Sequence, residues 1–196
     1  MRRLLLWITL MIPFLANAQF KKGDSFLGGT ISYQGTEGDV DVTPFVGYFV
    51  NPRLALGASL QVGYAKSEQP GQYNGGIHQM INTTRDFTAA LTAQRFYTIA
   101  DKFFFSLRAA ASYTRTSEKV EILDYDITSY NNLYSVGAEV TPLFLYFPSS
   151  RWSIEAGLGS LKYAFTRGLT DRSNRQNVSL DFGKVSLGFV YYFRKS

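Results

Sequence analysis

The stretch "TPFVGYFVNPRLALGASLQVGY", residues 43–64, decides the fold. It is apolar enough to suggest a membrane-spanning helix, yet Asn51, Pro52 and Arg53 interrupt it. Beyond Arg53 every second side chain is apolar, and the residues between are small or polar. The apolar set is Leu54, Leu56, Ala58, Leu60, Val62 and Tyr64. Because successive side chains of a strand point to opposite faces, the stretch predicts two strands joined by a tight turn at residues 51–53.

This alternation with a period of two residues recurs along the chain and predicts eight strands in all. The alternation loses its phase near residues 159–163 and 180–183, where either a bulge or the end of the buried band is expected. Pro44 and Pro142 stand inside expected strands and cannot donate a ladder hydrogen bond, so we expect a repeated local bulge at these two positions. The other alternating segments are residues 27–33, 40–50, 87–97, 103–114, 134–141, 152–158 and 185–193.

Residues 1–18 are predicted to be a cleaved signal peptide. A basic start is followed by an apolar run over residues 4–15, and Ala16-Asn17-Ala18 provides small residues for cleavage before Gln19. An uncleaved anchor helix is the alternative, but the run is shorter than the ~20 residues that a spanning helix needs. Residues 19–196 are then expected to form one domain.

The composition excludes several classes of protein. The net charge of +5 comes with no clustered basic helix, so no nucleic-acid partner is expected. The absence of cysteine excludes a disulfide framework and a lipoprotein anchor. We expect no cofactor and no metal.

The expected connections alternate in length. Short turns are expected at residues 51–53, 98–102 and 148–150. Long polar loops are expected at residues 34–38, 66–84, 117–131 and 167–177. Short turns at one end and long loops at the other are typical of outer-membrane barrels.

A repeat of 49 residues connects the short turns: Arg53, Lys102 and Arg151 each begin a strand. Aromatic residues end the strands that enter these turns, Tyr48 and Phe49 among them, and predict an aromatic girdle at one membrane interface. Ordinary core aromatics under a soluble sheet are the alternative. The predicted girdle comprises Tyr48, Tyr97, Tyr146, Tyr191 and Phe193.

The two faces of the predicted strands differ in a way that indicates which one meets lipid. One face is almost free of charge, whereas the other carries Gly, Ser, Thr and Ala with a few charges. Small residues suit the crowded interior of a barrel of eight strands. The fold class is therefore all-β: an eight-stranded antiparallel up-and-down transmembrane β-barrel preceded by a cleaved signal peptide. A soluble lipid-carrier barrel remains the rival interpretation.

The C-terminal segment "SLGFVYYF", residues 186–193, resembles the terminal signal that the barrel-assembly machinery reads, although three residues follow it here. With the signal peptide and the strand count, residues 19–196 resemble the small eight-stranded outer-membrane barrels, such as outer-membrane protein X and the barrel of outer-membrane protein A. The resemblance implies a monomer in the outer membrane of a Gram-negative bacterium, with both termini periplasmic and with lipid and lipopolysaccharide as surroundings.

Four charged residues are predicted to face the lumen, one on each of the last four strands: Arg108, Glu139, Glu155 and Lys184. A structural network that braces the lumen is the favoured interpretation, because buried charges need partners. An ion gate or proton path is the alternative.

The expected loops supply the remaining candidates. Arg167, Arg172 and Arg175 form a candidate contact for lipopolysaccharide phosphates. Tyr73, Tyr125, Ile127 and Tyr130 are candidates for a protein-binding surface. His78, the single histidine, cannot by itself build a metal site, and no catalytic residue is assigned.

The predicted function is therefore a structural or surface-interaction role through four long extracellular loops, with the lumen closed by side chains. A narrow pore is the alternative, followed by a lipid-modifying enzyme built around His78.

Overall fold

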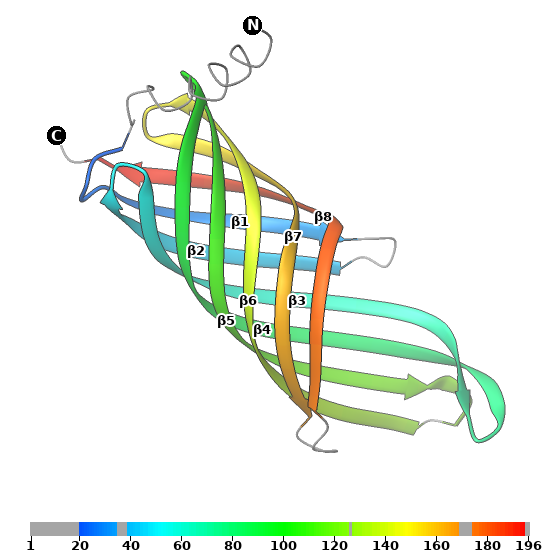
Figure 1. Ribbon diagram of the computed structural model, residues 1–196. Helices are drawn as coiled ribbons and strands as arrows, with labels where there is room; N and C mark the ends of the chain where they lie inside the picture. Colours follow the sequence, from blue (N-terminus) through cyan, green and yellow to red (C-terminus); the bar gives the residue numbers. More distant parts are fainter. Residues whose placement is uncertain (1–19, 35–38, 126, 169–173, 195–196) are drawn as a thin grey trace, which may run out of the picture.

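The computed structural model describes residues 20–34, 39–125, 127–168 and 174–194. In this part of the chain eight strands form a closed antiparallel barrel, in which β8 also pairs with β1 (Figure 1). The strands are β1 Ser25–Gln34, β2 Asp39–Asn51, β3 Leu54–Tyr73, β4 Gly76–Ala100, β5 Phe103–Ile122, β6 Ile127–Ser149, β7 Trp152–Gly168 and β8 Asn174–Phe193, with a 3-10 helix, η2, at Leu123–Tyr125. The predicted eight-stranded up-and-down barrel is confirmed. The predicted signal peptide lies outside the described residues.

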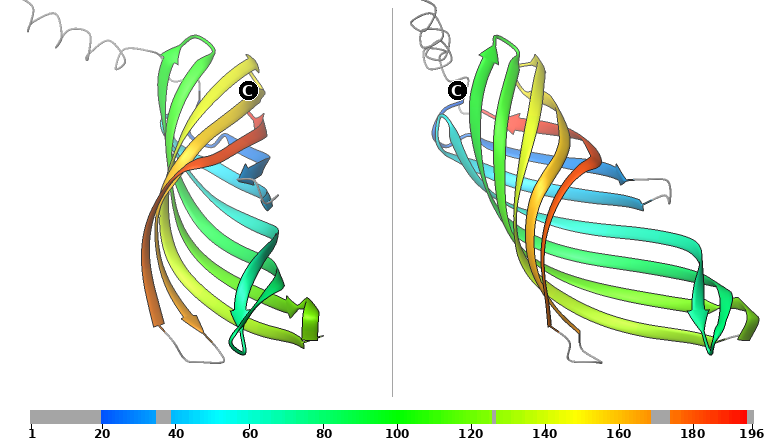
Figure 2. Two further views of the ribbon diagram at one scale, coloured as in Figure 1. Left: turned by 90° about the vertical axis from the view of Figure 1, so that its right-hand side faces the viewer. Right: turned by 45° about the vertical axis from the view of Figure 1, so that its right-hand side comes forward.

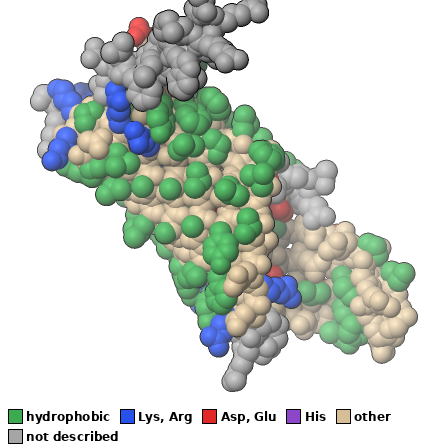
Figure 3. Space-filling model, in the orientation of Figure 1, with side chains coloured by type: hydrophobic (Ala, Val, Ile, Leu, Met, Phe, Trp, Pro, Cys, Tyr) green, Lys and Arg blue, Asp and Glu red, His purple; other side chains and the backbone are tan. Residues whose placement is uncertain are grey.

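The alternation of the sequence becomes the two faces of the barrel wall. In β3, Leu56, Leu60 and Val62 are exposed on the outside, whereas Ala55 is buried in the interior. The outer surface is accordingly a hydrophobic band, and on the face in Figure 3 Lys and Arg side chains gather toward its two ends. No helix of the described residues is long and apolar enough to cross a bilayer.

The short turns lie at one end of the barrel, called the turn end here, together with the start of β1 and the end of β8 (Figure 1). Asn51 shapes the first of these turns, since its side-chain Oδ1 accepts a hydrogen bond from the N–H of Arg53 at 2.9 Å. Ser149 Oγ accepts the corresponding bond from Arg151 N–H at 3.4 Å. The opposite end is called the loop end.

Two of the four expected long loops are paired strands instead. β3 and β4 pair as far as Tyr73 and Gly76, and β5 and β6 pair as far as Ile122 and Ile127. The four strands therefore continue beyond the barrel as one sheet, which Figure 2 shows projecting from the loop end. We call this the protruding sheet: residues 65–73, 76–84, 118–122 and 127–131. The expectation of loops was wrong because water covers both faces of this sheet, so no apolar alternation marks its strands.

The two prolines behave differently. At Pro142 the register between β6 and β7 shifts between Val140 and Leu143, and at Gly159 the register between β7 and β8 shifts as well. At Pro44 the pairing of β2 with β3 keeps one register on both sides, so the expected second bulge is absent. Pro44 remains opposite Gly29 of β1, and the β2–β3 ladder is interrupted only at Thr43 and Pro44, where the missing N–H of proline is accommodated.

Candidate functional site

Two of the four predicted lumenal charges form an ion pair inside the barrel. Arg108 Nη2 donates to Glu155 Oε2 at 2.7 Å, and the Glu155 side chain is only 2% exposed. β5 and β7 carry the pair across the lumen. The same guanidinium donates through Nε to Gln94 Oε1 at 3.1 Å and lies 4.7 Å from the ring centre of Phe45. Arg108 therefore has polar and aromatic partners on three sides.

The other two predicted members are not part of this pair. Glu139 is half-buried, and its hydrogen-bond donor among the described residues is the hydroxyl of Thr141 at 3.5 Å. The side chain of Lys184 lies outside the described residues. Sequence reasoning missed Gln94, which extends the pair by donating to Ser106 Oγ at 2.9 Å.

On the loop-end side of the Arg108–Glu155 pair lies a polar cavity of about 260 Å³. Its charged lining includes Asp86, Arg108, Glu139 and Lys162. The hydroxyl groups bond to one another and to acids: Thr88 and Thr114 are 2.8 Å apart, and Thr116 donates to Asp86 at 2.5 Å. We call this cavity the lumenal chamber. It can hold water or a small polar solute.

On the turn-end side of the pair, aromatic rings fill the lumen. We call them the ring cluster: Phe20, Phe49, Phe96, Phe104, Phe147 and Tyr192, each at most 3% exposed. Phe20 precedes β1 and lies at the centre, 4.2 Å from Phe49, 5.0 Å from Phe96 and 5.3 Å from Tyr192 between ring centres. Arg194, just past β8, lies 5.5 Å from the Phe20 ring. The two ends of the described chain thus meet in one cluster.

The sequence repeat positions this cluster. The carbonyls of Arg53, Lys102 and Arg151 accept the N–H groups of Phe96, Phe147 and Tyr192, each at 2.8 Å. A fourth, equivalent bond at 2.8 Å connects the Asp24 carbonyl with Phe49 N–H. The repeated basic residues therefore mark the points where each hairpin anchors one ring of its neighbour.

The aromatic pairs at the turn end divide between the two faces of the wall. Tyr48 is 45% exposed on the outside and Phe49 is fully buried. The assignment of Phe49 to the outer girdle was therefore wrong, because adjacent residues of a strand face opposite ways. The five predicted girdle residues all occupy outward-facing positions of their strands: Tyr48, Tyr97, Tyr146, Tyr191 and Phe193.

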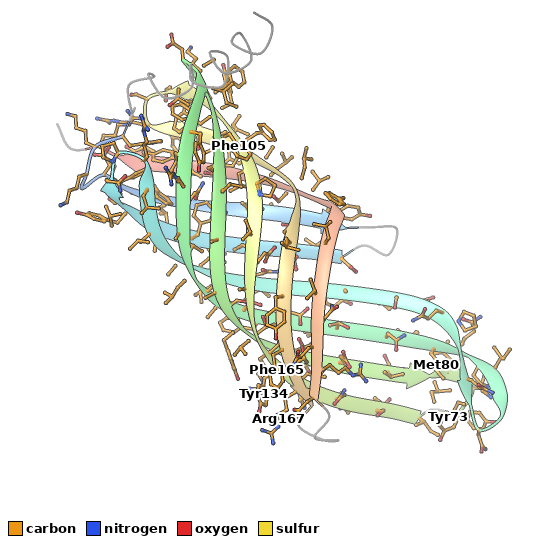
Figure 4. All side chains as sticks on the ribbon, viewed as in Figure 1. Tyr73, Met80, Phe105, Tyr134, Phe165 and Arg167 are labelled. Carbon is orange, nitrogen blue, oxygen red and sulfur yellow. The ribbon has the colours of Figure 1, made fainter. Side chains whose placement is uncertain are left out.

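Sequence reasoning missed a second row of outward aromatics at the loop end of the apolar band. Its members lie where the outward-facing apolar residues of each strand end. Figure 4 labels two of them, Tyr134 and Phe165. The rings of Tyr113 and Tyr134 stack at 6.4 Å. The row comprises Tyr33, Tyr64, Phe87, Tyr113, Tyr134, Tyr163 and Phe165.

His78 lies at the far end of the protruding sheet and joins its two hairpins. Its Nδ1 is 2.7 Å from Asp124 Oδ2, and its ring packs edge-on against Tyr125 at 4.9 Å. Tyr73, which belongs to the same hairpin as His78, also packs against Tyr125, with 5.7 Å between the ring centres. The Asn74-Gly75 turn, with φ of 49° and 82°, closes the first hairpin, and this dipeptide is the sequence signal that predicts such a turn.

The outer strands of the protruding sheet are unpaired on their far sides within the described residues. The β2–β3 ladder ends at Tyr64, and the β6–β7 ladder begins at Leu133. Apolar side chains are exposed at the tip, namely Tyr73, Ile77, Leu123, Tyr125, Ile127 and Tyr130. Nearby, a hydrogen bond from Lys119 to the Glu121 carboxylate, at 2.8 Å, raises the pKa of that lysine.

The three arginines of the predicted lipopolysaccharide contact do not form a described cluster. Arg172 lies outside the described residues. Arg167 pairs with Asn174, whereas Arg175 pairs with Thr166, so the two arginines stand on opposite faces of the β7–β8 hairpin. Arg167 faces outward beside Tyr134.

No protein-family model and no curated protein matches the chain. Among solved structures, a major outer membrane protein from Thermus thermophilus is similar with a TM-score of 0.55 and 13% identity, over 87% of this chain and 99% of that one. The outer membrane protein OprG from Pseudomonas aeruginosa has a TM-score of 0.52 and 14% identity, over 91% and 100%. Neisserial surface protein A has a TM-score of 0.50 and 15% identity, over 87% and 95%. The chain has the fold of the small outer-membrane β-barrel proteins.

Proposed function

We propose that this chain is a surface-interaction protein of the Gram-negative outer membrane, with both termini in the periplasm and the protruding sheet outside the cell. The observation that carries the proposal is the sheet itself, whose two outer edges are unpaired within the described residues and whose tip is apolar. An open sheet edge offers backbone groups to an added strand. Exposed apolar side chains well away from the lipid band favour a protein partner.

The contacts at the tip support recognition by a preformed surface. The His78–Asp124 hydrogen bond and the Tyr125 packing connect the two hairpins, so little order has to be gained on binding. The same contacts support a non-enzymatic role. The Asp124 carboxylate holds His78 Nδ1 as the acid of a catalytic triad holds its histidine, but no hydroxyl of the described residues hydrogen-bonds to the His78 ring, so the nucleophile that serine hydrolysis needs is not assigned.

A closed lumen is the second part of the proposal, and the ring cluster supports it. Phe20 is surrounded by rings from five other positions, and the Arg108–Glu155 pair lies between these rings and the lumenal chamber. The outward aromatics at the turn end are proposed to lie at the periplasmic interface of the outer membrane, where the bilayer meets water. Assembly is proposed to follow recognition of the β8 terminal segment by the barrel-assembly machinery.

The narrow pore is kept as a second candidate because the lumenal chamber is lined mainly by polar side chains from several strands of the barrel. Conduction through it would require the ring cluster to move. Planar-bilayer recordings separate the two candidates: silence is expected for the closed barrel, and steady open-channel currents would favour the pore.

The recognition role is tested with a variant in which Gly-rich turns replace residues 66–83 and 118–131. Extended peptides from a display library are selected on the wild-type protein in nanodiscs and counter-screened on this variant. We expect to select peptides that bind the wild type but not the shortened variant. These peptides should also lose binding when Ile77 and Tyr130, both strongly exposed, are replaced by serine. Binders that hold equally well to the shortened barrel would refute the role. Trypsin cleavage of intact cells within the sheet tests the orientation.

A further inference from the structure

The outer face of the barrel carries two arginines in line with each other where the apolar band ends at the loop end. Arg115 of β5 pairs across the sheet with Tyr134 of β6, and Tyr134 pairs in turn with Arg167 of β7. Both arginines are exposed. Since neighbouring strands lie ~4.8 Å apart, the two arginines flank Tyr134 with ~10 Å between their backbones. Figure 4 shows Tyr134 and Arg167 together at this rim.

Neither arginine has an acidic partner in the described part of the chain. The cross-strand neighbours of Arg115 are Phe87 and Tyr134, and those of Arg167 are Tyr134 and Asn174. The acids at this level of the barrel face inward, as Asp86 does toward Thr116. The two guanidinium groups therefore keep their donors for an outside anion.

A shallow apolar hollow of about 800 Å³ lies on the same outer face, on the turn-end side of Arg115. Its outward lining combines small residues, such as Ala89 and Ala111, with the larger Leu60, Leu91, Tyr113 and Val136. Tyr113 is two residues from Arg115 on the same face of β5, and Val136 is two residues from Tyr134 on β6. Cationic donors and an apolar hollow thus adjoin each other.

We propose that Arg115, Tyr134 and Arg167 bind the phosphate of an outer-leaflet lipid whose acyl chain lies in this hollow. Guanidinium groups bind phosphate oxygens in bidentate fashion, and a tyrosine hydroxyl at the interface adds a donor. A phosphate at the headgroup depth and an acyl chain below it match the order of the two features along the wall. The inference rests on the proposed membrane location but does not depend on the recognition role of the protruding sheet.

The test measures lipid binding to the purified protein in phosphatidylcholine nanodiscs, which expose both leaflets and so do not require the proposed orientation. The probe is bisphosphorylated lipid A, titrated by native mass spectrometry. The variant is Arg115→Gln/Arg167→Gln, and the matched control with the same change of charge is Arg95→Gln/Lys21→Gln at the turn end. We expect about a 30-fold loss of affinity in the variant and about a fivefold loss for each single change, with the control unchanged.

Three further arms decide the chemistry. Enzymatically dephosphorylated lipid A should bind the wild type and the variant alike. Inorganic phosphate at millimolar concentration should not displace the lipid. Ala111→Leu, which fills the hollow without touching the arginines, should weaken lipid A but not its water-soluble deacylated disaccharide bisphosphate. Equal losses in the variant and the control would overturn the proposal, as would displacement by inorganic phosphate. Heat-modifiable migration in detergent gels verifies that each variant is folded.

Discussion

Breaking the Arg108–Glu155 pair tests the account of the barrel interior most directly. The two charged atoms are 2.7 Å apart, and the side chains are 17% and 2% exposed. At that distance and an effective dielectric constant of ~20, the attraction is about 6 kcal/mol, most of which desolvation offsets. Removing one partner leaves the other charge without compensation, so Arg108→Met should lower the free energy of unfolding by about 3–5 kcal/mol.

The two single changes should differ in size. Arg108→Met leaves a fully buried carboxylate, whereas Glu155→Gln leaves an arginine that retains Gln94 and the Phe45 ring. We therefore expect Glu155→Gln to cost less, about 1–3 kcal/mol. The double variant should be more stable than the sum of the single effects predicts, with a coupling of about 2 kcal/mol.

Urea unfolding in lipid vesicles supplies the measurement, because Trp152 is the one tryptophan of residues 19–196 and faces outward. Lys119→Met is the matched control: it removes a Lys–Glu pair of nearly equal length, 2.8 Å, whose side chains are 37% and 35% exposed. Exposed pairs contribute little to stability. If Arg108→Met costs no more than this control and the effects of the double variant are additive, then Arg108 and Glu155 do not form a coupled, buried ion pair.

Contacts at Gly159, Phe20 and His78 lead to three other predictions. Gly159→Ala should destabilise the barrel by about 3 kcal/mol in the same unfolding assay, because a Cβ at φ +88° would collide with the Asp181 carbonyl. Gly75→Ala, which shares the backbone strain of a positive φ (+82°) but meets nothing within 4 Å, should cost less, about 1 kcal/mol. Phe20→Ala should cost about 3 kcal/mol and raise conductance in planar bilayers; unchanged current would show that the other rings suffice to close the lumen. His78→Ala should speed trypsin cleavage of the protruding sheet without changing barrel unfolding, and equal cleavage rates would show that His78 does not order the tip.

Sequence reasoning predicted well wherever one side of a strand meets lipid and the other meets the lumen. There the alternation is strict, as in residues 54–64 and 103–113, and it led to the right faces for Arg108 and Glu155. It failed in the protruding sheet, where both faces are solvated and β3 and β4 continue without an apolar period. The Asn74-Gly75 turn was the remaining local signal of that hairpin.

The sequence by itself determined the strand count, the up-and-down order and the outward face of the strictly alternating segments, because the period of two residues is a local property of the backbone. Only the tertiary structure decided which side chains meet. Arg108 and Glu155 are 47 residues apart in sequence, and Arg115, Tyr134 and Arg167 lie in line through the register of three strands. Register depends on bulges such as the one at Gly159. The convergence of Phe20 with rings of other strands depends on closure of the barrel, which no local pattern specifies.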